Sequence, residues 1–554
     1  MRRTSIRFRW AVSATVLALL FVACGGSDKG KTEKGSAAEA KPGGVFRLGI
    51  VEPTAIDPYN SQESEGILVT KQLFTGLTTL DETTVELRPG VAESWAKSDD
   101  CTEWTFNLRS GTTFTNGEEV TAESFIRGMT RAAKQAAASD VAYHMAGIAG
   151  YTDLHGTGQP GSVAKATEFS GLSAPDPHTL KVKLSAPDCE FDRKTLQPVM
   201  SPVPKDAGDA ANKAFNDAPV GNGPFKLEGG WRHDQGITLV RNDSYFGDKA
   251  YLDKVELTIL PSQDAAEAEY RGAQSNQFDY ARIPPALIPQ AKATYEPKHG
   301  FISKLSYGIN YLLVNVVNPP LNSPDARKAI SLAIDRDAII DGVFKGFQTK
   351  ATSIIPPPLK AYYQPTVCDV CDKPDLGRAK ALAASGGLPP GTKVSLAFNT
   401  GGGHEAWVQA IGQELEKNLG LKVDLQPSPF AELLKKEKAD NASGLFRAGW
   451  SADYPSAENF LFPLLSKHSL PPGDNRGRYV NERFDDLLAQ ARKAPTESAR
   501  ANLIKEAEKQ AIGTDMALIP LWYRSQYRVF EASKWAGVSL DFFENPSLAT
   551  IHQK

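Results

Sequence analysis

The residues that could perform catalysis are spread along this chain of 554 residues and match no catalytic signature. The GxSxG and HExxH patterns are missing from the sequence, and the GxxxxGK[ST] frame of a phosphate-binding loop is missing around the glycine-rich stretch at 401–405. Acidic pairs such as Asp99-Asp100 are typical of solvated turns. The glycine-rich stretch GGGHE at 401–405 is best interpreted as a strand-to-helix loop, in which His404 is the candidate functional residue. These residues alone leave both a binding protein and a hydrolase open.

The cysteines predict two disulfides. Besides Cys24 there are four, an even number that in an exported chain favours bridges. Cys368 and Cys371 form a CxxC pattern, which redox or metal sites also use, but no second CxxC and no histidine lies nearby. We therefore predict a local Cys368–Cys371 bridge. Cys101 and Cys189 are left to pair, and each flanks a strand-like run that could lie beside the other.

The first 41 residues predict export and a lipid anchor. Four arginines precede an uncharged apolar run that ends in FVAC at 21–24. An ordinary secretory signal or a membrane-spanning anchor are the alternatives, but FVAC resembles the bacterial lipoprotein signature. We predict a signal peptide at 1–23, acylation of Cys24 and a flexible polar tether at 24–41.

The composition is that of an ordinary globular protein. Hydrophobic residues make up 41% and charged residues 23% of the chain, and the net charge is −3. The chain has no basic stripe, so we expect no nucleic-acid partner. Its length predicts two to four folding units.

The hydrophobic periodicity changes near residue 310. Before it, alternating strand patterns dominate; after it, strand and helix patterns alternate through 393–428, which predicts a βαβ unit with a parallel sheet. Residues 323–344 predict one amphipathic helix, with Pro324 near its start. The strand pattern at 516–530 is expected to return to the first strand, near Val45.

One segment points to a family. LFRAGWSADYPSAENFLFPLLS at 445–466 resembles the corresponding segment of oligopeptide- and dipeptide-binding proteins that serve ATP-binding-cassette importers. RPGVAESW at 88–95, VGNGPFKL at 220–227 and MALIPLWY at 516–523 also resemble family segments, in the same order. The resemblance runs from about Gly44 to the end of the chain.

The resemblance implies an α/β fold of the two-lobed periplasmic-binding-protein type. An extra subdomain is inserted in the N-terminal lobe, and hinge closure of the lobes captures the ligand. The implied parts are an N-terminal lobe at 42–64, 202–307 and 520–554, an inserted subdomain at 65–201 and a second lobe at 308–519.

The resemblance also implies the charged contacts of a peptide site. Asp453 matches the family aspartate that pairs with the peptide ammonium, a role that suits an acceptor-only carboxylate. Arg447 and His404 match residues that receive the peptide carboxylate. Glu52 matches a glutamate at the cleft edge that contacts the peptide backbone.

The remaining implied contacts involve main chain and aromatic residues. Main-chain groups of Gly449 to Ser451 would pair with the peptide as an added strand. Trp450 would wall a side-chain pocket, with core packing as its alternative role, and Tyr143 would reach the site from the inserted subdomain. Some relatives carry cysteine where Ser451 stands, so any bridge from that position is absent here.

The expected function is capture of short peptides outside the cell. The resemblance implies a receptor anchored through Cys24 to the extracytoplasmic face of a bacterial membrane, which delivers peptides to the permease subunits of an importer. We expect no enzyme activity, no cofactor and no metal. A nickel chelate or a sugar is the alternative ligand, and an extracellular peptidase is the alternative from another class.

Overall fold

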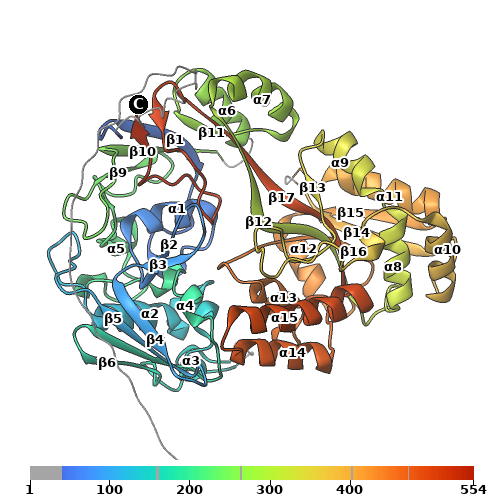
Figure 1. The fold of residues 1–554 in the computed structure, drawn as a ribbon, viewed down its shortest axis with the longest axis horizontal. Helices are drawn as coiled ribbons and strands as arrows, with labels where there is room; N and C mark the ends of the chain where they lie inside the picture. Colours follow the sequence, from blue (N-terminus) through green and yellow to red (C-terminus); the bar gives the residue numbers. More distant parts are fainter. Residues whose placement is uncertain (1–39, 158–160, 262–264, 401–402, 472) are drawn as a thin grey trace, which may run out of the picture. The chain divides into compact units, whose positions relative to one another are not determined.

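The structure is a computed structural model, and the residues that it describes begin at Ala40, close to the end of the predicted tether (Figure 1). The predicted signal peptide, Cys24 and nearly all of the tether lie outside the described residues. At the start of the described chain, Lys41 forms a β-bridge with Gln553, close to the C-terminus. The described residues are 40–157, 161–261, 265–400, 403–471 and 473–554.

One large mixed sheet organises the described part of the chain. Its strands lie in the order β15 (Lys422–Ser428), β14 (Lys393–Asn399), β16 (Leu445–Ser451), β12 (Phe301–Val314), β17 (Leu518–Phe530), β11 (Tyr280–Arg282), β1 (Val45–Val51), β10 (Lys254–Leu260), β9 (Gly236–Arg241) and β8 (Phe225–Leu227), and β13 (Thr349–Lys350) pairs with β17. The short pairs are β2 (Thr78–Leu80) with β3 (Leu87–Pro89) and β18 (Trp535–Ala536) with β19 (His552–Gln553).

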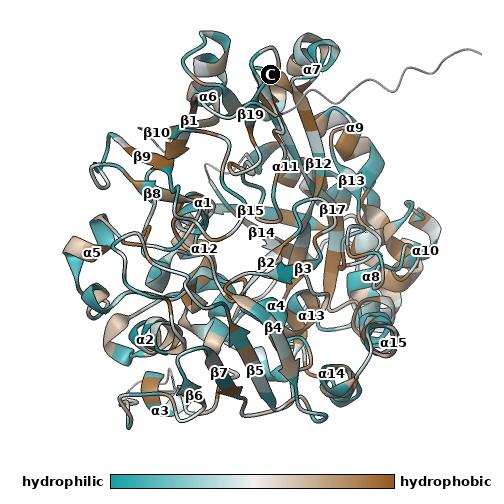
Figure 2. Cartoon of the chain, turned by 60° about the vertical axis from the view of Figure 1, so that its left-hand side comes forward, coloured by the Kyte–Doolittle hydropathy of each residue, from teal (hydrophilic) through white to brown (hydrophobic). Residues whose placement is uncertain are grey.

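The helices surround these strands. They are α1 (Ser64–Leu73), α2 (Ala122–Ala133), α3 (Tyr151–His155), α4 (Phe191–Lys194), α5 (Lys213–Asp217), α6 (Ala265–Gln274), α7 (Ile288–Tyr295), α8 (Pro324–Ala333), α9 (Arg336–Phe344), α10 (Leu376–Ser385), α11 (Glu405–Leu419), α12 (Phe430–Lys438), α13 (Glu458–Leu465), α14 (Glu482–Lys493) and α15 (Glu497–Glu508). In Figure 2, strands such as β5 and β9 carry brown, apolar positions, whereas much of the outer helix surface is teal. Among the described residues, none of these helices has the length and apolar character needed to cross a bilayer.

The predicted βαβ unit is confirmed. β14 pairs in parallel with both β15 and β16, and α11 connects β14 to β15. The predicted single helix at 323–344 is wrong, because it is two helices, α8 and α9. Ile334 is extended between them, and the Asp335 side chain starts α9 by accepting a hydrogen bond from the Ala338 N–H at 3.0 Å.

The last long strand does return to the sheet of the first, but with one strand in between. β17 pairs with β11, and β11 pairs with β1. β17 also runs antiparallel to β12 over two stretches, residues 301–305 with 525–529 and 309–313 with 518–523, with register shifts between and within them. This long pair therefore joins the two halves of the sheet, as Figure 1 shows for β12 and β17.

The inserted segment has its own sheet and core. The sheet is antiparallel, in the order β4 (Ala92–Lys97), β5 (Glu103–Leu108), β7 (Thr179–Lys183) and β6 (Leu172–Asp176). Trp104, Phe106 and Phe125 are buried in its core, and Thr121 and Ser124 form a capping box at the start of α2.

We propose that the chain is divided into the lobes predicted from the sequence, except that the inserted subdomain starts later than predicted. Leu68, Val69 and Leu73 of α1 pack in the same cluster as Phe46 of β1, whereas the core of the inserted segment begins at Leu77. The inserted subdomain is therefore better started near residue 77 than at 65.

The structure contains both predicted disulfides. Cys101 and Cys189 are joined with their Cα atoms 5.0 Å apart, and Cys368 and Cys371 with theirs 5.3 Å apart. The first bridge lies beside β5 and β7, which lie side by side as expected from the sequence and pair antiparallel.

Candidate functional site

A cavity of about 400 Å³ lies where three parts of the chain meet. Segments near α1, from the inserted subdomain, from the end of β16 and from the middle of β17 all contribute to its lining. Of the residues predicted from the sequence, it brings together Asp453, Ser451 and Tyr143. Glu63, Gln197 and Arg524 line it as well.

Asp453 is the central acidic group of this cavity. Its backbone N–H donates to Asn459 Oδ1 at 2.8 Å, and Asn459 Nδ2 donates to Asp453 Oδ2 at 3.0 Å. Within the described part of the chain, no cationic side chain forms an ion pair with it. Burial raises the pKa of Asp453 to about 6, although the hydrogen bond from Asn459 acts in the opposite direction. A cation brought by a ligand would satisfy this carboxylate.

The inserted subdomain docks directly on the loop that carries Asp453. The Gln197 amide donates to the Asp453 carbonyl oxygen. Nearby, Arg193 Nη1 donates to Pro455 O at 2.7 Å, and Ser456 Oγ donates to the buried Glu190 Oε2 at 2.7 Å. The position of Asp453 therefore depends on contacts between distant segments.

Tyr143 and His144 close the cavity from the inserted subdomain. Both lie on a 3₁₀ helix, Ala142–Met145, and 51% of the Tyr143 surface is exposed. Burial of its hydroxyl and the nearby charge of Asp453 raise the pKa of Tyr143 well above its ordinary value, so it remains a hydrogen-bond donor. Burial lowers the pKa of His144 to about 3, which keeps its ring neutral.

β16 offers unpaired backbone groups beside the cavity. The Ala452 N–H donates to Tyr307 O at 2.8 Å, and from there the antiparallel register pairs Ser451 with Gly308 and Gly449 with Asn310. Because such bonds alternate along a strand, the N–H and C=O groups of Gly449 and Ser451 are directed away from β12. On that side of β16, the neighbouring described strand β14 pairs only with residues 445 and 446.

Arg447, His404 and Arg524 form a cationic and polar group near the same strand. Arg447 Nη1 donates to Asn399 Oδ1 at 3.3 Å, while its buried Nε has no hydrogen-bond partner among the described residues. Burial and the charge of Arg524 lower the pKa of Arg447 to about 10, so it stays charged at neutral pH. His404 Nδ1 accepts from Trp407 Nε1 at 3.3 Å. Burial and both arginines lower the pKa of His404 to about 3, which leaves a neutral ring.

Five of the predicted residues do not line the cavity: Arg447, His404 and Gly449, described above, and also Glu52 and Trp450. Glu52 accepts from His233 Nδ1 at 2.9 Å and from the Asp234 N–H at 3.1 Å. Trp450 packs against the large hydrophobic cluster of the second lobe, and its Nε1 donates to Asn459 Oδ1 at 3.2 Å. These contacts agree with the alternative role of Trp450 in core packing.

Sequence reasoning did not identify Glu63, Gln197, Asn459 or Arg524. Glu63 caps α1 by accepting from the Gly66 N–H at 3.1 Å, and within the described part of the chain its other carboxylate oxygen is buried without a hydrogen-bond partner. A capping acid before a helix is visible in sequence, but its exposure to a cavity is not. Arg524 lies in a mainly apolar strand pattern, and its charge at that position was the feature that could have indicated a functional role.

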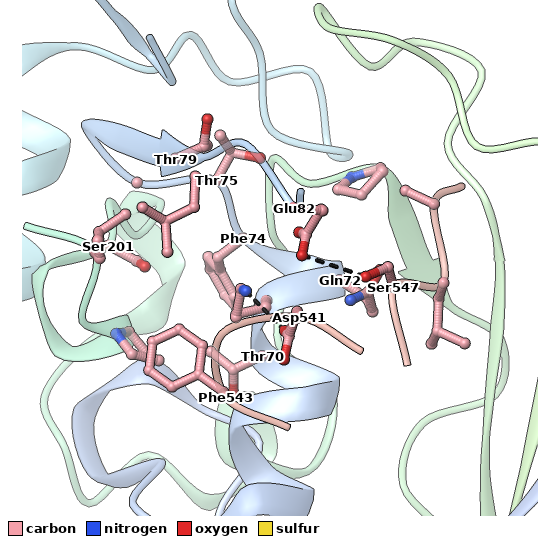
Figure 3. A pocket seen from close by; sticks show the side chains of 18 of the residues that line it. Thr70, Gln72, Phe74, Thr75, Thr79, Glu82, Ser201, Asp541, Phe543 and Ser547 are labelled. Carbon is pink, nitrogen blue, oxygen red and sulfur yellow. Dashed lines mark hydrogen bonds and ion pairs between the residues drawn. The ribbon is translucent and has the colours of Figure 1, made fainter. Parts of the chain in front are cut away.

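A second cavity, of about 170 Å³, lies beside α1 (Figure 3). Its charged groups have partners within the protein: Lys71 Nζ lies 2.9 Å from Asp541 Oδ2, and Ser547 Oγ donates to Glu82 Oε2 at 3.2 Å. Phe543 lines both cavities. The internal pairing makes this cavity a weaker candidate for a charged ligand.

The chain belongs to the bacterial extracellular solute-binding proteins of family 5, whose middle-region model matches residues 86–471. It is 28% identical to the oligopeptide-binding protein OppA of Bacillus subtilis (strain 168), over 93% of this chain and 94% of that protein. It is 29% identical to the probable deoxycholate-binding periplasmic protein YgiS of Escherichia coli (strain K12), over 87% and 88%.

A solved structure agrees with the fold. The Escherichia coli murein tripeptide binding protein MppA superposes with a TM-score of 0.73 at 25% identity, covering 93% of this chain and 98% of that one. The α/β fold of the two-lobed periplasmic-binding-protein type, expected from the sequence, is therefore confirmed.

Proposed function

We propose that this protein is a receptor for short peptides that holds the ligand ammonium at Asp453 and delivers the peptide to an ATP-binding-cassette importer. The observation that carries the proposal is a buried carboxylate in a cavity, without a cationic partner among the described residues. The names of an oligopeptide-binding and a murein-tripeptide-binding relative support it.

The other polar groups suit the rest of a peptide. The open backbone groups of Gly449 and Ser451 would pair with ligand amides, which gives affinity with little dependence on side-chain identity. Arg447 and His404 would receive a ligand carboxylate, and Tyr143 would donate to the ligand from the opposite wall. Contact of Glu52 with the peptide stays a prediction, because its present partners are His233 and Asp234.

Two alternatives remain to be separated by experiment. A nickel chelate or a sugar would leave the Asp453 charge uncompensated, and an extracellular peptidase would cleave what it binds. Incubation with an unmodified tetrapeptide, followed by mass spectrometry, distinguishes these cases. Our proposal expects the peptide to be recovered bound and intact.

We predict that peptide affinity decreases as the pH is lowered, because Asp453 becomes protonated. Its pKa is about 6 in the free protein, and a bound ammonium would lower it, so only the ionised form binds well. Affinity should be constant down to about pH 7 and about tenfold weaker near pH 5. Tyr143 and His144 do not titrate in this range.

Calorimetry at the two pH values measures this effect, and the Asp453→Asn variant is its control. The variant should show a weak affinity that does not change between them. A wild-type affinity that is equal at both would contradict the assignment of the ammonium to Asp453.

We also propose that Cys24 carries the lipid anchor. Replacing Cys24 with Ser removes the acylation site, so the protein should move from the membrane fraction to the medium. Fractionation followed by immunoblotting measures the distribution. Retention of the variant in membranes would assign the anchor to another feature.

A further inference from the structure

The side chain of Arg524 extends across a neighbouring strand to reach the cavity. It lies on β17, and its Nη1 donates to Ser451 Oγ on β16, with β12 between these strands. A glycine at 308 on β12 makes this possible, because an ideal Cβ there would lie 2.8 Å from Arg524 Cδ and 3.1 Å from Ser451 Oγ. The missing side chain at Gly308 leaves room for the arginine.

A second guanidinium lies close by. Arg447 and Gly449 share one face of β16 with Ser451, since side chains alternate along a strand. Arg447 Nη2 lies 3.8 Å from the ideal Cβ position of Gly449, so this guanidinium extends along the strand toward Ser451. Two arginines thus flank the backbone groups that face the open edge of β16.

Two acidic residues near this pair have other partners. Glu437, whose charge acts on Arg447, is paired with Arg476 at 2.7 Å. Glu544 lines the same cavity as Arg524 and accepts from the Gln526 amide. Within the described residues, neither Arg447 nor Arg524 forms an ion pair, and Arg447 Nε has no hydrogen-bond partner. Glu63 and Asp453 line the same cavity as Arg524, but among the described residues neither forms an ion pair with it. The two guanidinium groups are therefore available to an anion that a ligand brings.

We propose that Arg524, together with Arg447, binds a carboxylate of the ligand and so selects peptides with an anionic group near their N-terminus. The inference rests on the proposed function, because it takes Asp453 as the ammonium site. Ser451 and Asp453 are two residues apart, about 7 Å along an extended chain. That spacing suits the C-terminal carboxylate of a dipeptide or an acidic side chain at the second position.

The test compares carboxylate ligands with neutral analogues of the same shape. The ligands are Ala-Ala, its C-terminal amide, and the tetrapeptide amides Ala-Asp-Ala-Ala and Ala-Asn-Ala-Ala. Arg524→Gln retains a donor for Ser451 but removes the charge. It should weaken at least one carboxylate ligand by about ten- to a hundredfold and its neutral analogue by less than about threefold. The ligand affected identifies the source of the carboxylate.

Two further variants complete the test. Arg524→Lys keeps the charge without the planar fork and should restore part of the selectivity. Arg483→Gln, at an exposed position on α14, should leave all affinities unchanged. If Arg524→Gln leaves both carboxylate-to-neutral affinity ratios unchanged, the inference is wrong. Peptides that still require Asp453 would then leave the proposed function intact, whereas a wild type that binds no peptide would refute the proposed function itself.

Discussion

Asp453→Asn should weaken binding of an unmodified peptide by about 30-fold to several-thousand-fold, or about 2–5 kcal/mol. The amide keeps the shape of the side chain but leaves the ligand ammonium in a closed cavity without its counter-ion. N-acetylation of the peptide removes the other charge and should cost the wild type a comparable amount. The two losses should not add, because the acetylated peptide has no ammonium left to pair.

Calorimetry on the four combinations of protein and peptide gives the coupling energy directly. Asp486→Asn is the matched control, since this aspartate is exposed on α14 and should have no effect. Full additivity of the two losses would show that Asp453 does not contact the ammonium.

The stability of the same variant separates lost contact from misfolding. Burial raises the pKa of Asp453 to about 6, so above that pH the ionised carboxylate reduces the stability of the free protein, by up to about 3 kcal/mol. This cost disappears as the pH falls toward the ordinary aspartate pKa. The amide does not ionise, so near pH 7.5 the ligand-free variant should unfold at the same temperature as the wild type or at a higher one.

Asp57→Asn should reduce the free energy of unfolding by about 3–5 kcal/mol. Arg131 donates to both carboxylate oxygens of Asp57, at 2.7 and 2.8 Å, and both side chains are almost completely buried. The substitution leaves the Arg131 charge buried among Tyr59 and Phe215 without a counter-ion. Urea unfolding measures the loss.

Two further variants test the cause of this loss. Asp57→Asn combined with Arg131→Met removes both charges and should recover part of the stability. Glu432→Gln breaks an exposed ion pair with Lys435 and should change stability by less than about 0.5 kcal/mol. A change below about 1 kcal/mol for Asp57→Asn alone would contradict the assigned importance of the buried pair.

This ion pair also bears on the site. It fixes α2 of the inserted subdomain against the 3₁₀ helix Pro58–Asn60, which Asp57 caps, and Asp140 N, near Tyr143, donates to Asn60 Oδ1 at 2.7 Å. We therefore expect Asp57→Asn to weaken peptide binding as well, through loss of the wall that carries Tyr143.

The βαβ unit and the two disulfides could be predicted because recognisable sequence patterns indicate them. The parallel arrangement of β14 and β15 follows from strand–helix alternation, and the disulfides follow from cysteine count and flanking strands. The break between α8 and α9 was missed, since a continuous apolar pattern hides the cap that Asp335 provides.

The site was harder to predict where it depends on contacts between distant segments. Asp453 and Ser451 stand in one recognisable motif and do line the cavity. Arg524 lies on β17, and β12 separates it from β16. Its side chain can extend across β12 because the residue there is a glycine, and no local sequence pattern indicates this arrangement. Gln197 is brought there by docking of the inserted subdomain, and Glu52 is occupied by a histidine 181 residues away.

The central claim is that the ligand is a peptide with a free ammonium, and native mass spectrometry tests it most directly. The purified protein, stripped of ligand, is offered an equimolar mixture of a tetrapeptide, its N-acetylated form, a nickel–histidine chelate and a disaccharide. Our account predicts one added mass, that of the intact unmodified tetrapeptide. Equal retention of the acetylated peptide, or binding of the chelate or the disaccharide instead, would contradict it.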